Sequence, residues 1–296
     1  MPFVYWKLDN DIHSARFLTK RERAQAMERL RANQGGGGSP QLQWSQVVET
    51  FLDIKTYWFI GMALANNLGA QVTNTFGPLI LSGLGFDKYK TSLLNMPFGA
   101  LQYILILAVA YAALKVRWKS LTLIVILIPI LAGLILLYII PRDGSQTATL
   151  LIGYYFLAFI FGGNPLIVSW ILANTAGQTK KSVMMACYQA AASTGNIIGP
   201  LLFNSVDAPS YHPGLQKTLG VFAMFFLLVL LQIGNLFFLN RRHEKTRIAN
   251  GKPAKLLDHS MEERYVDMTE NSNPQLGSLA FANVTDLEND EFIYVY

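Results

Sequence analysis

The side chains that could bind a ligand in this sequence are uncharged amides and hydroxyls inside long apolar stretches. Two of these stretches carry polar groups at spacings i, i+4 and i+7, which places each set on one face of a helix. The candidates for a substrate path are Asn67, Gln71 and Asn74 in the first set, Gln189, Ser193 and Asn196 in the second, and Asn164 between them. Two interpretations stay open: the side chains hydrogen-bond a polar substrate, or they join helices to one another.

Small residues and prolines form a second set of candidates. Ala191, Gly195 and Gly199 repeat every four residues, a spacing that allows two helices to approach closely. Glycines and prolines within an apolar stretch also predict interrupted helices, which free backbone groups near a cavity and act as bends. We expect an interruption in the second apolar stretch, at Pro97 and Gly99. The helix-packing and gating candidates are Gly162, Gly163, Pro165, Gly195, Gly199 and Pro200.

The sequence offers no combination of residues typical of an enzyme. Its apolar stretches contain no charged residue and no histidine in their interiors, and the single cysteine, Cys187, lies inside one of them. We recognise no nucleophile–base pair, carboxylate pair or metal-ligand cluster. The sequence therefore predicts a protein that is not an enzyme and that uses neither a metal nor a cofactor.

The composition is typical of a protein that crosses a membrane several times. The 296 residues are 52% hydrophobic and only 15% charged, whereas a soluble domain carries about 25% charge. A transmembrane helix needs roughly 20 apolar residues. The sequence predicts an all-α membrane protein with six transmembrane helices, at about 56–81, 91–114, 120–140, 150–173, 183–203 and 217–240.

The distribution of basic residues predicts the orientation of these spans. Lysines and arginines gather in the second and fourth connections and after the sixth span, as at Lys180 and Lys181, while the other connections hold little net positive charge. Positive charge marks the cytoplasmic side, so we expect both termini in the cytosol and, for the protein as a whole, a plasma-membrane location. The net charge of +5 then reflects membrane orientation, and we expect no nucleic-acid partner.

Four regions follow from this pattern. Residues 1–40 resemble a cytoplasmic segment with a charged helix, begun by a capping box at Thr19–Glu22, and a glycine linker. Residues 41–55 predict an amphipathic surface helix, and residues 56–240 the six-helix bundle. Residues 241–296 are polar and acidic for most of their length and predict a disordered cytoplasmic tail.

Several short motifs follow one another along the chain, at 15–19 with 33–34, 44–47, 76–80, 95–99, 174–181 and 195–200, with further matches at 207–209, 211, 213, 288–289 and 291–292. In this order and spacing they resemble the carboxy-terminal half of fungal major facilitator transporters of the allantoate permease type, in the anion:cation symporter group. By this resemblance, residues 1–55 are similar to the central cytoplasmic loop and residues 56–240 to spans seven to twelve.

The resemblance also implies an activity. Members of that family have two six-span bundles with the substrate site between them, and they import small organic anions such as allantoate, ureidosuccinate and vitamin-like carboxylates, generally with protons. The expected partners are thus a small-molecule substrate, protons, the lipid bilayer, and an N-terminal half or a second copy. Two alternatives stay open: a metabolite efflux carrier, and a truncated, non-transporting membrane remnant or interaction protein.

Overall fold

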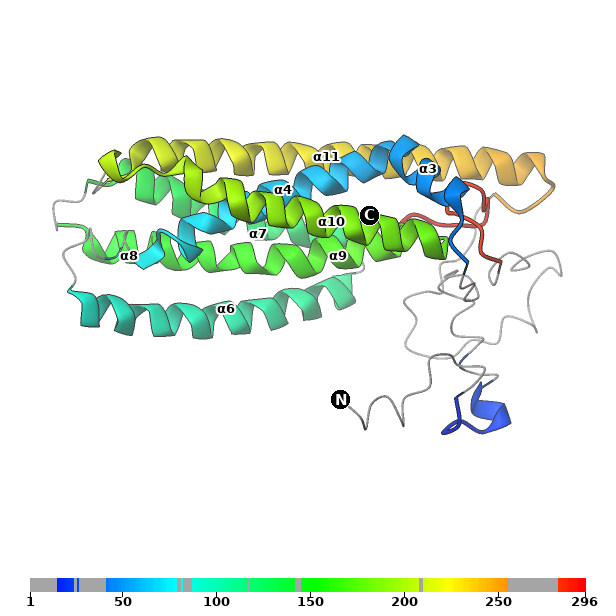
Figure 1. Ribbon diagram of the computed structural model, residues 1–296, viewed down its shortest axis with the longest axis horizontal. Helices are drawn as coiled ribbons and strands as arrows, with labels where there is room; N and C mark the ends of the chain where they lie inside the picture. Colours follow the sequence, from blue (N-terminus) through cyan, green and yellow to red (C-terminus); the bar gives the residue numbers. More distant parts are fainter. Residues whose placement is uncertain are drawn as a thin grey trace. The chain divides into compact units, whose positions relative to one another are not determined.

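The computed structural model describes residues 15–23, 26, 41–78, 81, 87–116, 118–141, 145–207, 210–254 and 282–296 (Figure 1). Its regular elements in these ranges are helical. In chain order they are α3 (Trp44–Leu52), α4 (Ile54–Asn74), α6 (Lys88–Val116), α7 (Lys119–Ile139), α8 (Thr147–Phe156), the 3₁₀ helix η1 (Leu157–Gly162), α9 (Gly163–Ala173), α10 (Gln178–Ile198), the 3₁₀ helices η2 (Gly199–Leu202) and η3 (Ser205–Asp207), and α11 (His212–Ala249).

The chain forms two compact units. Unit 1 comprises residues 1–52, 172–183 and 238–294, and unit 2 comprises residues 53–171, 184–237 and 295–296. Unit 2 has an apolar interior that includes Phe59, Leu123 and Trp170, all fully buried. The rings of Phe59 and Trp170 meet edge to face with their centroids 5.4 Å apart, an arrangement that aromatic pairs favour.

Four helical stretches in the described chain are long and apolar enough to cross a membrane. They are Tyr89–Lys115, Lys119–Ile139, Thr147–Ala173 and His212–Ala249. The prediction of a helical membrane protein is thereby confirmed, while the count of six spans stays a prediction. Helices α4 and α10, which carry most of the polar candidates, have 21 residues each and are not among the four.

Local chemistry explains where α4 begins. Asp53 is its N-cap residue, and the carboxylate accepts a hydrogen bond from the Lys55 backbone N–H at 3.1 Å. The same side chain lies 2.9 Å from the Lys55 ammonium group, and both side chains are almost fully buried. Capping satisfies a backbone donor that has no partner within the helix. The ion pair offsets the free-energy cost of removing the two charges from water.

The glycine- and proline-based interruptions turn out differently in two spans. Between α8 and α9 the backbone adopts the tighter 3₁₀ form over Leu157–Gly162, immediately before Gly163, as the prediction of a break near Gly162 requires. Helix α6 instead continues through Pro97 without a break, so the interruption expected there is wrong. A proline removes a single backbone donor, and the remaining bonds of this 29-residue helix hold it together.

A helix within residues 41–55 and the capping box are both present. The helix predicted there corresponds to α3. Thr19 accepts a bond from the Glu22 N–H at 3.3 Å, and Glu22 accepts from the Thr19 N–H at 2.9 Å, which is the reciprocal pattern of a capping box. Most of the charged helix expected at 23–34, and the glycine linker, lie outside the described residues.

The prediction of a disordered tail from residue 241 is corrected in two segments. Helix α11 continues to Ala249, and residues 282–296 lie against other parts of the chain, with Asp286, Phe292 and Tyr294 buried. Low apolar content suggested disorder, but the few apolar residues of the segment are concentrated near its end, and its acidic groups have basic partners. Residues 255–281 lie outside the described part of the structure.

Candidate functional site

A hydrogen-bonded amide network in unit 2 joins three helices. The Asn164 Oδ1 atom of α9 accepts bonds from Asn66 Nδ2 at 3.0 Å and from Asn67 Nδ2 at 3.1 Å, both on α4. It also accepts from the Tyr188 hydroxyl of α10 at 3.1 Å. Asn164 Nδ2 in turn donates to Asn67 Oδ1 at 3.1 Å. One amide group thus ties α4, α9 and α10 together.

A second polar contact joins α4 to α10 at another level. Gln71 Nε2 donates to Asn196 Oδ1 at 2.8 Å, and Gln71 Oε1 accepts from the Thr75 hydroxyl at 2.8 Å. The two stripes predicted from the sequence therefore meet at Gln71 and Asn196. Amides in an apolar surrounding need such partners, because an unpaired polar group is costly there.

The remaining candidates of the two stripes point away from the interior. Asn74 on α4, and Gln189 and Ser193 on α10, are exposed, as is Asn196. The exposed face of α10 thus carries two amides and a hydroxyl at the predicted spacing. Lipid offers no hydrogen-bond partners to such groups, so in a membrane this face requires protein or water beside it.

Glycines allow α10 to lie directly against α4. A methyl group added at Gly195 would lie 2.7 Å from the Leu64 carbonyl oxygen, and one at Gly199 would lie 2.8 Å from the Leu68 carbonyl oxygen. Both distances are shorter than atoms tolerate, so only glycine permits this separation of the two backbones. Such close packing between helices is typical of small-residue repeats in membrane proteins.

The other packing candidates occupy the ends of their helices. Gly163 begins α9 against the Asn66 side chain, and Gly162 lies against Val109. Pro165 is exposed in the first turn of α9. Pro200 occupies the first turn of η2, where the missing N–H of proline costs little. The structure therefore gives Gly163 a direct position beside the amide network.

Sequence reasoning missed two members of the network. Asn66 precedes Asn67 and falls outside the i, i+4, i+7 stripe, and Tyr188 precedes Gln189. Asn66 is buried because it faces α9 rather than α10. The available signal was the glycine pair before Asn164, since only a residue without a side chain at Gly163 leaves room for Asn66.

Large aromatic side chains of the fourth predicted span are part of the interior. Tyr154 and Trp170 are fully buried. The Tyr154 hydroxyl donates to Asn95 Oδ1 at 2.9 Å, and the Tyr155 hydroxyl donates to the Leu94 carbonyl oxygen at 3.1 Å. These bonds join α8 to α6, so these side chains hold helices together.

Comparison with known proteins agrees with these features. The chain is 35% identical over 277 residues to the MFS-type transporter cnsL of Penicillium expansum, an alignment that covers 91% of this chain and 54% of that protein. The chain is thus similar to fungal MFS-type transporters over most of its length. The family resemblance read from the short motifs is thereby confirmed.

Two relatives from Saccharomyces cerevisiae match nearly the whole chain. Allantoate permease is 28% identical over 303 residues, covering 98% of this chain and 51% of the permease. Thiamine pathway transporter THI73 is also 28% identical over 303 residues, covering 100% of this chain and 51% of that transporter. The chain thus spans about half the length of the curated relatives it matches. No family model and no solved structure matches it.

Proposed function

We propose that this chain supplies the carboxy-terminal half of a secondary transporter that moves a small polar or anionic organic metabolite across a membrane. The observation that carries the proposal is the exposed polar face of α10, formed by Gln189, Ser193 and Asn196 beside the amide contacts to α4. A membrane helix keeps such a face only where water, substrate or another bundle covers it.

The proposal assigns six spans to the chain. Four come from the apolar helices of the structure, and α4 and α10 supply the other two. Each of these has 21 residues, which corresponds to about 30 Å of helix, enough for the hydrocarbon core. Their lower hydropathy is the expected consequence of lining a polar path. Transport then proceeds by the movement of this bundle against the amino-terminal one.

The substrate class rests on the relatives. One relative is named an allantoate permease and another a thiamine pathway transporter, which supports a small nitrogen-containing or carboxylate metabolite. The amides of the path donate and accept hydrogen bonds with such groups without carrying charge. We assign proton coupling to the amino-terminal half, because the spans predicted here have no Asp, Glu, His, Lys or Arg in their interiors. Both termini are assigned to the cytosol. The carrier itself is assigned to the plasma membrane.

The test is an uptake assay in the full-length carrier. Alanine at Gln189, which lies on the exposed face of α10, is expected to raise the KM or lower the maximal uptake rate at unchanged membrane abundance. Ile197→Ala is the matched control, because Ile197 is an exposed apolar residue of the same helix. Unchanged kinetics for alanine variants of Gln189, Asn196, Gln71 and Asn67 alike would refute the proposed path.

A further inference from the structure

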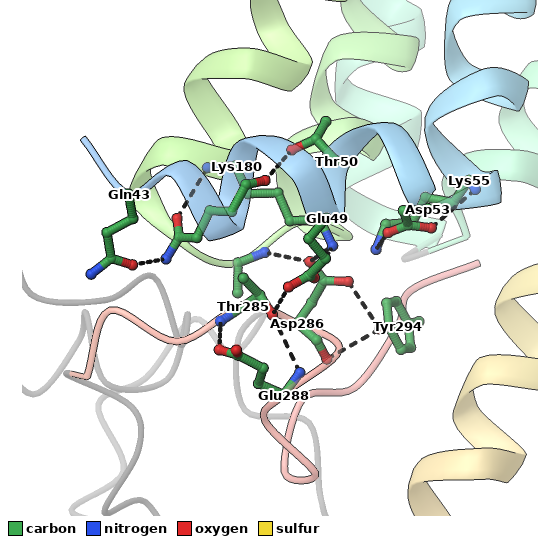
Figure 2. Close-up of polar contacts among 12 residues, drawn as sticks. Gln43, Glu49, Thr50, Asp53, Lys55, Lys180, Thr285, Asp286, Glu288 and Tyr294 are labelled. Atoms are coloured by element: carbon green, nitrogen blue, oxygen red, sulfur yellow. Dashed lines mark hydrogen bonds and ion pairs between the residues drawn. The ribbon is translucent and has the colours of Figure 1, made fainter.

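A buried ionic cluster in unit 1 is centred on Lys180, in the first turn of α10. Its ammonium group lies 2.7 Å from Glu49 Oε1 of α3 and 3.1 Å from Asp286 Oδ1 of the C-terminal segment 282–294 (Figure 2). The side chains of Lys180 and Asp286 are fully buried. Glu49 also accepts a bond from the Thr285 hydroxyl at 2.8 Å. One lysine thus holds together three segments that are far apart in the sequence.

The C-terminal segment also covers the connection between α9 and α10. Asp286 accepts the backbone N–H of Ala176 at 3.1 Å, and Asn283 Oδ1 accepts that of Gln178 at 2.9 Å. These bonds satisfy backbone donors of a connection that is buried from residue 174 to residue 177. The segment therefore replaces water as the hydrogen-bond partner of this turn.

The polar side of α3 faces the same cluster. Gln46 is buried and donates from Nε2 to the Asn283 carbonyl oxygen at 2.8 Å, while its Oε1 accepts the Lys180 backbone N–H at 3.1 Å. The apolar residues Trp44, Val48 and Leu52 are instead more than half exposed. Helix α3 thus uses its polar face to bind other parts of the chain, which is the reverse of an ordinary surface helix.

The end of α11 binds the rest of the segment. Asn240 Nδ2 donates to the Tyr294 carbonyl oxygen at 2.9 Å, His243 Nδ1 lies 3.1 Å from the Phe292 carbonyl oxygen, and Arg247 donates to the Asp290 carbonyl oxygen at 2.7 Å. The rings of Phe292 and Tyr294 are buried. The segment is therefore bound as an extended peptide is, through its backbone and two buried aromatic anchors.

The segment makes hydrogen bonds both to other parts of the chain and within itself; the internal ones form a compact turn. They include the capping turn between Thr285 and Glu288 and the bond from the Tyr294 hydroxyl to Asp286. A buried ion pair contributes little net stability but is costly when one partner is missing. If the segment left, the Lys180 ammonium group would lose Asp286 as a partner, and its return to water would be favoured over burial with Glu49 alone. The covalent connection through residues 255–281 keeps the released segment at a high local concentration.

We propose that residues 282–294 are a detachable C-terminal clasp whose binding holds α3 and the start of α10 together, and whose release regulates the carrier. The regulatory part rests on the proposed function, because α10 carries the exposed face of the proposed path. The binding part does not depend on transport.

The first experiment measures hydrogen exchange of the purified full chain with Thr285→Glu. A carboxylate at this position would face Glu49, now 2.8 Å from the hydroxyl, and is expected to release the clasp. Exchange of peptides covering 174–180 and 282–294 should then accelerate about tenfold or more, with the helices of unit 2 unchanged. Thr285→Ser is the matched control, because it keeps the hydroxyl, and should exchange as the unaltered chain does.

A second variant and a peptide complete the test. Asp286→Asn keeps the shape but removes one charge beside Lys180, so it should accelerate exchange of 174–180 even if Thr285→Glu disturbs folding. A synthetic peptide of residues 282–296, added to the Thr285→Glu chain, should restore protection of 174–180. Unchanged exchange in both variants would overturn the clasp, and failure of the peptide to restore protection would overturn its detachability.

The regulatory part is tested by uptake in the full-length carrier. Thr285→Glu is expected to change the maximal rate severalfold at equal membrane abundance, whereas Thr285→Ser is not. Equal rates in a variant with a released clasp would overturn regulation. Absence of uptake in the unaltered carrier, with the exchange results as expected, would instead refute the proposed transport function and leave the binding of the clasp established.

Discussion

The amide network of unit 2 and the ionic cluster of unit 1 are both buried and polar, but they are built from different groups. In unit 2, Asn66, Asn67 and Asn164 bond one another without charge. In unit 1, Lys180 is paired with Glu49 and Asp286. A charged pair of unit 2, Asp53 with Lys55, lies at the very start of α4.

This difference matters for the surroundings that each set of groups tolerates. An amide carries no charge, so moving it between protein and lipid costs only hydrogen bonds. An ionised lysine released into hydrocarbon would cost several kcal/mol, whereas released into water it regains its hydration. Charged contacts that open and close therefore belong outside the bilayer, and neutral ones within it.

The largest effect is expected from Lys180→Met, which leaves the buried Asp286 carboxylate and the partly buried Glu49 carboxylate without their cation. Removing one partner of a buried ion pair typically costs about 3–5 kcal/mol. We expect a lower midpoint of thermal unfolding in detergent and lower membrane abundance. Lys245→Met is the matched control, because Lys245 is exposed on α11, and it should change stability by less than about 0.5 kcal/mol. Equal effects of the two variants would contradict the importance of the cluster.

A smaller effect is expected from Gly195→Ala in unit 2. The added methyl group would lie 2.7 Å from the Leu64 carbonyl oxygen, so α4 and α10 must separate, and overpacking of this kind costs about 1–3 kcal/mol. Gly220→Ala is the control, because an added methyl group there meets nothing within 4 Å, and it should be neutral or slightly stabilising. Thermal unfolding of both variants decides whether close packing, rather than a glycine bend, is the role of Gly195.

Sequence patterns predicted the helical membrane fold and the helix faces on which some polar residues lie, but not which neighbours these residues meet. The spacing of Gln71 and Asn196 placed them on helix faces, and the structure pairs them. The same spacing excluded Asn66, which binds Asn164 from a different face of α4. The spacing of residues in the sequence predicts on which face of a helix a side chain lies. Which residue it contacts depends on how the helices pack against one another.

The C-terminal segment was the least predictable part of the chain. Its composition resembles that of disordered tails, and its binding depends on Lys180 and Gln46, which lie more than a hundred residues away in sequence. A buried lysine in a turn between two spans gives no periodic signal. Long-range ion pairs of this kind follow from the fold and are not visible in local sequence.

A further test of the comparison is Asn164→Ala, which removes the shared acceptor of three donors. Hydrogen bonds between membrane helices contribute about 0.6 kcal/mol each on average, so a total loss of about 1–2 kcal/mol is expected. This is less than for Lys180→Met, because no charge is left unpaired. Asn164→Asp keeps the acceptor oxygens and should retain part of the stability at a pH where the carboxyl is protonated. A loss as large as that of Lys180→Met would contradict the comparison between neutral and ionic clusters.

The smallest effect concerns an edge of unit 1 where Lys252, whose side chain is 16% exposed, lies 2.7 Å from Asp290 Oδ1 and 2.9 Å from Glu291 Oε1. Burial alone would raise the pKa of Asp290, but hydrogen bonds from Lys252 and Asn250 outweigh it and lower the pKa. Burial alone would lower the pKa of Lys252, but hydrogen bonds to the two carboxylates outweigh it and raise the pKa.

The signs of these two shifts define a pH window. A lowered carboxyl pKa contributes stability above the unfolded value, about 3.9, that is lost as the pH falls through the folded pKa. A raised lysine pKa contributes stability below about 10.4 that is lost as the pH rises through the folded pKa.

Between these limits Asp290→Asn should lower stability by less than about 1 kcal/mol, because Lys252 remains partly exposed. Below about pH 4 the difference from the unaltered chain should shrink toward zero. Glu244→Gln is the control, because the ion pair of Glu244 with Arg241 is more exposed. The stability difference between this variant and the unaltered chain should not depend measurably on pH. A difference for Asp290→Asn that persists unchanged into acid would mean that packing around the side chain, rather than its charge, holds this end of the clasp.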